Sequence, residues 1–428
     1  MTLSDSAVPA SPSQGRFLDS NKAAVGLGGI AVALGTIVTL ALARLLDTDE
    51  FGRYALFVAA IRLLVLPSEA GLPSLITREM NRGDGDRVIS WSKRVFAATW
   101  LLLTAGLLAV EHFLRSGITV QTGLIAVSVG ALGMIYLSRG ILLGKRQTIA
   151  ALGPDSVVRP AVLLVLVGLA AATTGLNESV AEGAVVASIL VALGVALTLG
   201  RHHGKTESPA APVRLFDRML FKALVPLTLI KGVRLVNRRV EILVLGAFAL
   251  AAEVAVYNVA LQLTGLMLLA QTMVNSRLSP HIAKATKHDP EKVPALVAEA
   301  VKVSTGFAGV AFLGLVLVGR PVLALLGEDF SGSYTLALIL GGANLAGAAL
   351  GPTTMLLNMS DHAEDSLRSG FVAAVANIFL MFVLIPRIGA MGAALSAATV
   401  TVLIQVQRWV LVRRRLDLRS DILAGVRA

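Results

Sequence analysis

The stretch AVGLGGIAVALGTIVTLALARLL, residues 24–46, contains a single charged side chain, that of Arg44. A helix needs about 20 mostly apolar residues to cross the hydrocarbon core of a bilayer. The stretch therefore predicts a membrane-spanning helix. The polar residues before it lack the basic start and short apolar core of a cleavable signal sequence, so we expect this helix to be retained.

Eleven further stretches of this kind follow, which predicts about twelve membrane-spanning helices and an all-α polytopic membrane protein. The chain is 55% apolar and only 15% charged over 428 residues, whereas soluble domains are about one quarter charged. This composition excludes a soluble enzyme and a disordered chain. The predicted limits of the further spans are 54–74, 95–114, 119–138, 157–174, 180–200, 220–240, 254–276, 301–326, 334–359, 367–386 and 390–411.

The basic residues indicate how the chain is oriented. Of the 38 lysines and arginines, 28 fall in segments on the side of the N-terminus and only five in the opposite loops. Because cytoplasmic loops of membrane proteins are enriched in lysine and arginine, both termini are predicted to be cytoplasmic. Positions 117, 177 and 388 should then lie outside, and positions 84, 208 and 288 inside. This topology accounts for the net charge of +11 without a nucleic-acid partner.

An internal repeat divides the chain into two halves. DEFGRYALFVA (49–59) and AEVAVYNVALQ (252–262) match at their glutamate and tyrosine, Glu50 with Glu253 and Tyr54 with Tyr257, six spans apart. A weaker echo, EDFSGSY, occupies 328–334. The alternative is a shared way of starting a helix at the outer membrane interface. The predicted organisation is a disordered tail (1–20), an N-terminal lobe (21–200), a linker (201–219), a C-terminal lobe (220–412) and a basic tail (413–428).

The seventh span, KALVPLTLIKGVRLVNRRVE (222–241), carries charges inside the membrane. At about 100° per residue, Lys231, Arg234 and Arg238 share one helix face. Such residues are costly in lipid and usually face a cavity or one another. We predict that Lys231 and Arg234 line a cationic lumen suited to a diphosphate. Arg238 lies on the same face near the outer edge, where reaching the headgroups is the favoured alternative, and Glu241 is placed to pair with it.

The second span carries Arg62 and Glu69 on one face, with Pro67 between them. Arg62 lies close in depth to Arg234, so the two arginines would form a clamp on a phosphate. Equally, an arginine could pair with Glu69 or Glu241 as a latch between the lobes. Glu69 and Glu241 are also the candidate carboxylates for proton coupling. Pro67, together with Pro226 and Pro352 elsewhere, predicts bends in the spans.

The chain resembles the polysaccharide-exporter family of the multidrug/oligosaccharidyl-lipid/polysaccharide flippase superfamily. The resemblance rests on an ordered series of short phrases: ARLLDTDEFGRYAL (43–56), SEAGLPSLITREM (68–80), AEVAVYNVALQL (252–263), LLGEDF (325–330) and LIPRIGAMGAALSAA (384–398). Arg53 and Asp47-Thr48 depart from the family pattern, which puts the shape of the first outer turn in doubt.

The resemblance implies two pseudo-symmetric six-helix lobes around a central cavity. It also implies a flippase that moves an undecaprenyl-diphosphate-linked oligosaccharide across the bacterial cytoplasmic membrane by alternating access, in surface polysaccharide biosynthesis such as that of O-antigen. The expected partners are that substrate, membrane lipids and the polysaccharide polymerase machinery.

Three other functions remain as alternatives, one of which, a cation-independent lipid scramblase, the sequence does not distinguish from a flippase. A cation-coupled multidrug antiporter would be hindered by a cationic lumen, and an integral-membrane oligosaccharide polymerase or ligase would need a larger outer loop than any predicted here. The chain has no cysteine, its six histidines show no metal-ligand spacing, and GILLGKRQ (140–147) is not a phosphate-binding P-loop. We therefore expect no cofactor, no metal and no enzymatic activity.

Overall fold

The computed structural model describes residues 12–115, 119–173, 175–202, 217–265, 267, 282, 285, 289–360, 362–416 and 420–421. Within these ranges, side chains are described except at several positions, chiefly 12–25, 230–231 and 233–239. Almost all of the described residues are helical, and none of them lies in a β-strand. The prediction of an all-α protein is confirmed. The predicted tails and linker fall mostly outside the described residues.

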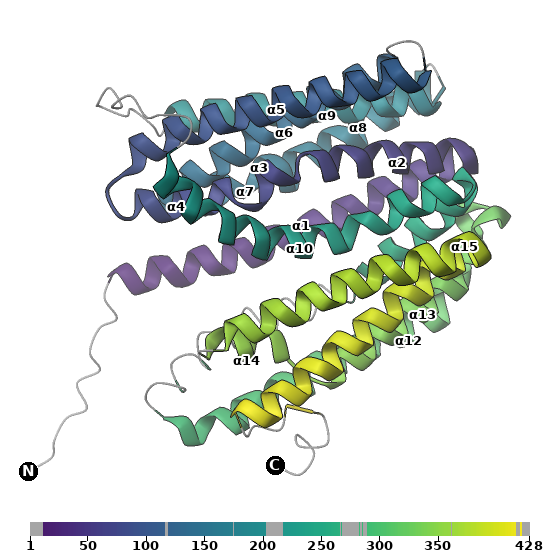
Figure 1. Cartoon of the computed structure of the whole chain (residues 1–428). Helices are drawn as coiled ribbons and strands as arrows, with labels where there is room; N and C mark the ends of the chain where they lie inside the picture. Colours follow the sequence, from purple (N-terminus) through teal and green to yellow (C-terminus); the bar gives the residue numbers. More distant parts are fainter. Residues whose placement is uncertain are drawn as a thin grey trace, which may run out of the picture.

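The first half of the chain forms one group of helices, in which α2 to α9 lie together (Figure 1). The helix α1 runs beside them and contacts α7 and α8. A π-helical turn, Pro154–Val158, joins α7 to α8. The helices are α1 (Pro12–Leu45), α2 (Thr48–Leu64), α3 (Leu66–Ala70), α4 (Leu72–Met80), α5 (Gly85–Arg115), α6 (Val120–Gly144), α7 (Thr148–Gly153), α8 (Arg159–Thr173) and α9 (Glu178–His202).

The second half forms another group, α12 to α15, with α10 running between the two groups (Figure 1). The helix α10 contacts α2, α3 and α4 of the first half as well as α15 of the second. The elements are α10 (Arg218–Phe248), a helix over 251–265, a 3-10 turn (Pro290–Lys292), α12 (Val293–Leu326), a second 3-10 turn (Glu328–Phe330), α13 (Gly332–Ala349), α14 (Thr353–Met359) and α15 (Ala363–Leu416).

Several predicted spans are interrupted where the sequence places proline or glycine. The chain bends by 49° between α2 and the α3–α4 segment that contains Pro67, and by 45° between α13 and α14 at Pro352. Gly351 next to Pro352 has φ +84°, a conformation that favours glycine. Pro226 lies inside a continuous α10. Non-helical backbone at Ile388 and Gly389 divides α15 into two helices, as the separate spans 367–386 and 390–411 predict.

Seven helices of the described residues are long and apolar enough to cross a membrane, and two bent pairs would add two more spans. Each of the twelve predicted spans overlaps a described helix. This number takes both halves of α15 together and leaves out α10, so the number twelve stays a prediction.

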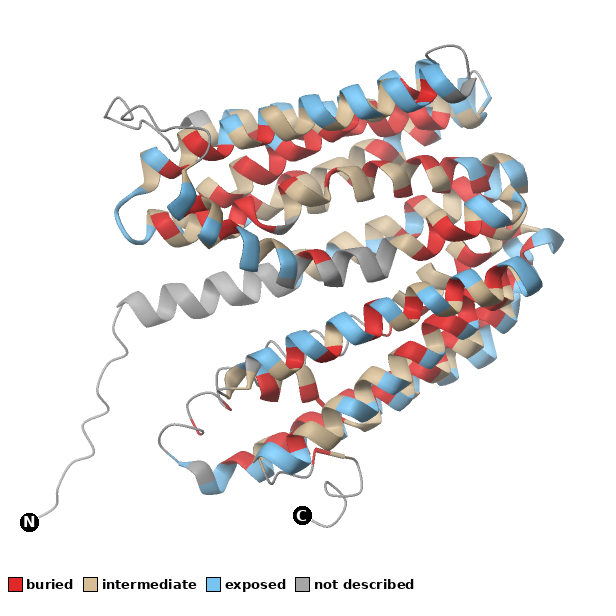
Figure 2. Cartoon of the chain, viewed as in Figure 1, coloured by how far each residue is buried: buried red, intermediate tan, exposed pale blue. Residues whose placement is uncertain are grey.

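The surface of the helix groups is apolar. Large hydrophobic side chains stand exposed on α5, where Leu102 is 74% and Phe113 84% exposed, and similarly on α12 and α15. Figure 2 shows buried residues where helices face one another and exposed residues along outward faces such as that of α5. Extended apolar surface of this kind is not tolerated in water, whereas lipid solvates it at no cost. The chain is therefore folded for a membrane.

Candidate functional site

Arg62 lies in the last turn of α2, directly before the bend to α3. Its Nη1 donates a hydrogen bond to the hydroxyl oxygen of Tyr136 on α6 at 2.7 Å. Its Nη2 lies 3.7 Å from Oδ1 of Asp155, and the same oxygen accepts from Nε of Arg159 at 2.8 Å. The side chains of Arg62, Asp155 and Arg159 are only 15%, 17% and 19% exposed. The N-terminal lobe thus holds a polar cluster, formed by Arg62, Tyr136, Asp155 and Arg159, in its interior.

The π-helical turn positions the carboxylate of this cluster. Asp155 follows Pro154, whose ring prevents a regular helical hydrogen bond, and the turn of Pro154–Val158 absorbs the disruption by widening. The helix then resumes at Arg159, four residues after Asp155, so that the two side chains lie on the same face. Single π-helical turns are frequent at functional sites, which marks this segment as more than a connection.

Glu69 lies on α3, beyond the bend, and is half-buried. It attracts Arg62 electrostatically, more weakly than Asp155 does. The ion-pair partner of Arg62 in this conformation is Asp155, in the same lobe, and not Glu69 or Glu241 as the latch hypothesis supposed.

Glu241 is buried in the C-terminal half, where it is 8% exposed. Its Oε2 accepts a hydrogen bond from the hydroxyl of Tyr257 at 2.5 Å, and its Oε1 accepts from the Asn377 amide at 3.3 Å. The predicted partner, Arg238, has a side chain outside the described residues. Glu241 is therefore a buried carboxylate whose hydrogen bonds join α10, the helix 251–265 and α15.

The side chains of Lys231, Arg234 and Arg238 all lie outside the described residues. For these three residues of the predicted lumen, the structure describes the backbone alone. These residues belong to the continuous helix α10. Gly232, next to Lys231, lies against the side chain of Leu66 at the α2–α3 bend. The middle of α10 and the end of α2, where Arg62 stands, are therefore neighbours.

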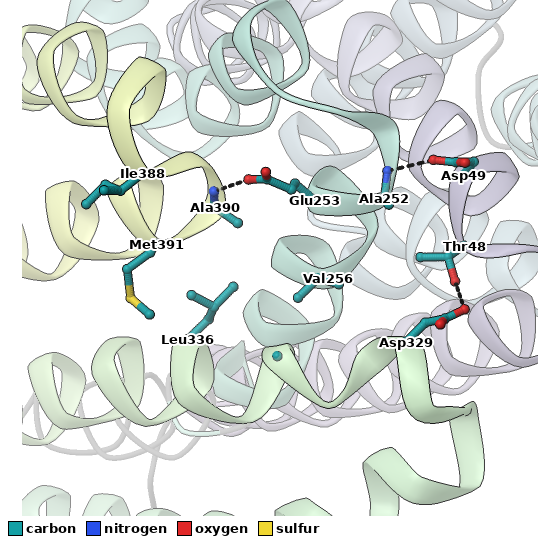
Figure 3. Close-up of a pocket in the computed structure, with 11 residues that line it drawn as sticks. Thr48, Asp49, Ala252, Glu253, Val256, Asp329, Leu336, Ile388, Ala390 and Met391 are labelled. Atoms are coloured by element: carbon teal, nitrogen blue, oxygen red, sulfur yellow. Dashed lines mark hydrogen bonds between the residues drawn. The ribbon is translucent and has the colours of Figure 1, made fainter.

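The two halves meet where α2 begins, around the pocket that Figure 3 shows. The Thr48 hydroxyl donates to Oδ2 of Asp329 at 2.7 Å, and the backbone N–H of Ala252 donates to Oδ1 of Asp49 at 3.1 Å. The sequence echoes at 49–59, 252–262 and 328–334 thus converge at one place. Each connection joins the first half of the chain to the second.

Close packing accompanies these hydrogen bonds. The rings of Phe51 and Phe330 meet edge to face with their centres 6.1 Å apart. Gly52 approaches the backbone so closely that a Cβ atom there would lie 1.8 Å from the carbonyl oxygen of Ala251. On the second half, Glu253 accepts from the N–H of Ala390 at 2.5 Å and so caps the helix that restarts after Gly389. The two halves are thus in contact at this end, around a pocket that Thr48, Asp329 and Ile388 line, and we call this contact region the closed end.

At the opposite end, α10 is fastened to the first half. Nη2 of Arg87 on α5 lies 2.6 Å from Oδ2 of Asp217, which also caps α10 by accepting from the N–H groups of Met219 and Leu220. The Arg87 guanidinium holds the pKa of the Asp217 carboxyl below its usual value, and the capping N–H groups act in the same direction. The helices α12 to α15 splay away from α5–α9 towards this end (Figure 1).

Sequence reasoning missed Asp155 and its partners Tyr136 and Arg159. The predicted fifth span begins at 157 and so leaves Asp155 out, whereas α7 already begins at Thr148 and the helical segment continues through Asp155. The spacing of Asp155 and Arg159, four residues apart, was the available signal of an intrahelical ion pair.

The comparisons with known proteins agree with this architecture. The sequence pattern of the family described as "Polysaccharide biosynthesis protein" matches residues 21–286, more than half of the chain. The "Probable flippase AglR" of Haloferax volcanii is 25% identical over 376 residues, which cover 85% of this chain and 76% of that relative.

Two solved structures share the fold. The inward-facing conformation of a multidrug resistance MATE family transporter of the MOP superfamily aligns with a TM-score of 0.72 at 16% identity, covering 92% of this chain and 94% of that one. The lipid II flippase MurJ, in an inward closed conformation, aligns with a TM-score of 0.71 at 11% identity, covering 90% and 86%. The expected two-lobed fold is thereby confirmed, and this chain belongs to the polysaccharide biosynthesis protein family, with the fold of the MOP-superfamily transporters.

Proposed function

We propose that this protein is a flippase that moves an undecaprenyl-diphosphate-linked oligosaccharide from the cytoplasmic to the outer leaflet of a bacterial cytoplasmic membrane, for surface polysaccharide biosynthesis. Membership of a polysaccharide biosynthesis family supports the pathway, and the name of the Haloferax relative supports the reaction. In this proposal the chain has two lobes, residues 21–200 and 220–412. The linker between them (201–219) and both tails lie in the cytoplasm. The polysaccharide polymerase machinery consumes the transported substrate.

The observation that carries the proposal is the interior position of Arg62. A guanidinium group held inside a membrane protein by Tyr136 and Asp155 offers paired donors to phosphate oxygens in a medium of low dielectric constant. The middle of α10, with Lys231 and Arg234, lies beside the end of α2. We propose that these three cations bind the diphosphate, with Arg238 near the outer edge of the same face.

The closed end at Thr48–Asp329 and the splayed opposite end fit one state of an alternating-access cycle. We assign the closed end to the outside, so the present conformation would accept substrate from the cytoplasm. Glu69 and Glu241 stay candidate carboxylates for ion coupling.

Reconstitution tests the proposal. The purified protein is placed in liposomes with a fluorescent undecaprenyl-diphosphate oligosaccharide, and transfer between leaflets is measured with a membrane-impermeant quencher. We expect transfer to depend on the protein and to be inhibited by unlabelled lipid diphosphate. Uptake of an organic cation, with no transfer of the lipid, would instead favour the multidrug antiporter that the MATE likeness raises.

A further inference from the structure

The cluster of Arg62, Tyr136, Asp155 and Arg159 carries more positive than negative charge. Arg62 and Arg159 share the single carboxylate of Asp155, and Arg139 on α6 adds a third guanidinium that attracts it electrostatically. Glu69, the other carboxylate nearby, acts from beyond the α2–α3 bend. One close carboxylate is therefore paired with two guanidinium groups, those of Arg62 and Arg159.

The two ion pairs of Asp155 differ in the distance between their charged atoms. Asp155 lies 2.8 Å from Arg159 but 3.7 Å from Arg62. Meanwhile Tyr136, which is fully buried, holds the Arg62 guanidinium at 2.7 Å. Arg62 is thus fixed in direction by a neutral group and only loosely neutralised by a charged one. A better anion could replace Asp155 at Arg62 without moving the arginine.

We propose that Asp155 is an internal counterion, which neutralises Arg62 and Arg159 while the site lacks substrate and is displaced from Arg62 by a phosphate group of the substrate. Arg159 then becomes a further phosphate-binding residue, and Asp155 is a specificity-determining residue that weakens the binding of other anions. The inference rests on the proposed function, because it names residues of the same diphosphate site.

A counterion of this kind serves release as well as binding. An excess of buried positive charge is costly in a membrane. Without Asp155, release of the substrate would leave such an excess, so the site would hold the phosphate group of the substrate more strongly. When the substrate leaves, the Asp155 carboxylate restores the neutralisation. Binding and turnover are therefore expected to respond in opposite directions to the loss of this carboxylate.

The experiment measures binding and transport in one set of variants of the full chain. Purified protein in nanodiscs of phosphatidylcholine is titrated with farnesyl diphosphate, a short lipid diphosphate, and the same variants are tested for leaflet transfer in liposomes. Asp155→Asn should bind farnesyl diphosphate about tenfold more tightly, the effect of removing one charge-assisted competitor. Its transport should be slower than that of the wild type.

A second variant guards against misfolding. Asp155→Glu keeps the charge and adds one methylene group, which shortens the gap to Arg62, so it should bind farnesyl diphosphate more weakly than the wild type. Opposite shifts of the two variants support the proposal. Weaker binding by both variants, or unchanged binding by Asp155→Asn, would overturn it in favour of a structural ion pair.

Matched controls separate the possible causes. Glu178→Gln removes an ion pair of 2.6 Å with Arg53 at the rim of the same lobe and should leave binding unchanged. Inorganic pyrophosphate and phosphatidylglycerol serve as competitors that distinguish free phosphate and lipid headgroups from a lipid diphosphate. If the wild type neither binds farnesyl diphosphate nor transfers the lipid-linked oligosaccharide, the proposed function itself fails; if it does both, the Asp155 variants alone decide this inference.

Discussion

Arg62 is stable inside the N-terminal lobe because its charge and its donors are both partnered there. The Tyr136 hydroxyl accepts one of its hydrogen bonds, and Asp155 supplies a negative charge at 3.7 Å. A buried guanidinium without such groups would retain the cost of leaving water. Because Asp155 is 3.7 Å away, no carboxylate of the described residues contacts the Arg62 guanidinium closely. The proposed function requires this, since a phosphate group of the substrate would bind the guanidinium there.

Replacing Arg62 tests whether its charge matters for transport. Arg62→Gln keeps hydrogen bonding but removes the paired charged donors, so polysaccharide export should fall by at least about tenfold. Arg62→Lys should restore export only in part, because an ammonium group cannot bind two phosphate oxygens side by side. Export is measured by complementation of a flippase-null strain, with protein amounts matched by immunoblot.

The double variants decide between a phosphate site and a structural ion pair. If Arg62 serves only to pair with Asp155, then Arg62→Gln combined with Asp155→Asn should recover export. If it binds substrate, this combination should stay defective. Full export by a variant that carries both Arg62→Gln and Arg234→Gln would contradict a cationic substrate site.

For single residues, the sequence predicts which charged side chains lie in the membrane but not which of them contact one another. Arg62, Glu69 and Glu241 stand out because ionisable residues are rare in apolar spans. Tyr136 and Asp155 do not stand out, since a tyrosine in a span is unremarkable and Asp155 precedes the predicted start of the fifth span at 157. Their contact with Arg62 depends on how α2, α6 and the π-helical turn pack, which periodicity alone does not determine.

The start of α10 combines a helix cap with an ion pair. Asp217 accepts from two N–H groups of the first turn and pairs with Arg87 on α5. Because both interactions require the carboxylate or favour it, the pKa of Asp217 is lowered in the folded protein. A lowered pKa means that the stabilisation is present above the unfolded value of about 3.9 and is lost as the pH falls through the folded value.

We therefore expect a pH-dependent effect of Asp217→Asn. Asparagine keeps the cap but loses the ion pair with an exposed arginine, so the melting temperature at pH 7 should fall by at most about 2 °C. The difference from the wild type should begin to shrink below about pH 4 and should vanish only once the pH is below the lowered pKa of Asp217, where the folded wild-type carboxyl is also protonated. Asp217→Ala should cost a further amount of about 1 kcal/mol, because it removes the cap as well. Thermal unfolding in detergent, followed over a pH series, checks this order.

The contact of α2 with the helix 251–265 depends on a glycine. A Cβ at position 52 would lie 1.8 Å from the carbonyl oxygen of Ala251, an overlap that backbone atoms cannot relieve without moving apart. Gly52→Val should therefore open the closed end. Thr48→Cys and Asp329→Cys, in a chain that has no other cysteine, provide the readout with a short thiol cross-linker.

We expect the cross-link between positions 48 and 329 to form readily in the otherwise unchanged chain and to be strongly reduced by Gly52→Val. Gly106→Val is the matched control, because a Cβ on Gly106 meets no atom within 4 Å. Equal cross-linking in both variants would show that the closed end tolerates the side chain.

The helices themselves follow from the sequence more directly than their pairing does. Length and apolarity place a helix at each predicted span. Of the three prolines that predict bends, Pro67 and Pro352 lie at bends, whereas Pro226 lies inside a continuous α10. That α10 of the second half lies along α2, α3 and α4 of the first is not readable, because apolar side chains pack equally well against many partners. The close approach of Gly71 to Leu224 and Thr228 of α10 fixes this arrangement.

In the whole molecule, the predicted outer loops gather at one end. Thr48 and Ile388 line the same pocket, and Arg53 pairs with Glu178, which follows the loop at 175–177. Arg87 and Asp217, at the starts of α5 and α10, mark the opposite end. Among the described residues, the chain ends near 48, 177 and 388 thus lie apart from those at Arg87 and Asp217, as the sequence predicts. The side of the membrane that each set faces is predicted from the distribution of lysine and arginine.

Cysteine accessibility determines that side. Single cysteines are introduced at 117, 177 and 388 for the predicted outer set, and at 84, 208 and 288 for the inner set, in a chain that is free of cysteine. On intact cells a membrane-impermeant maleimide should label the first three and spare the others until the membrane is permeabilised. The reason is the excess of 28 basic residues over five, since positively charged loops are retained in the cytoplasm. A reversed pattern at any two positions would contradict the topology, and with it the assignment of the Thr48–Asp329 closure to the outer face.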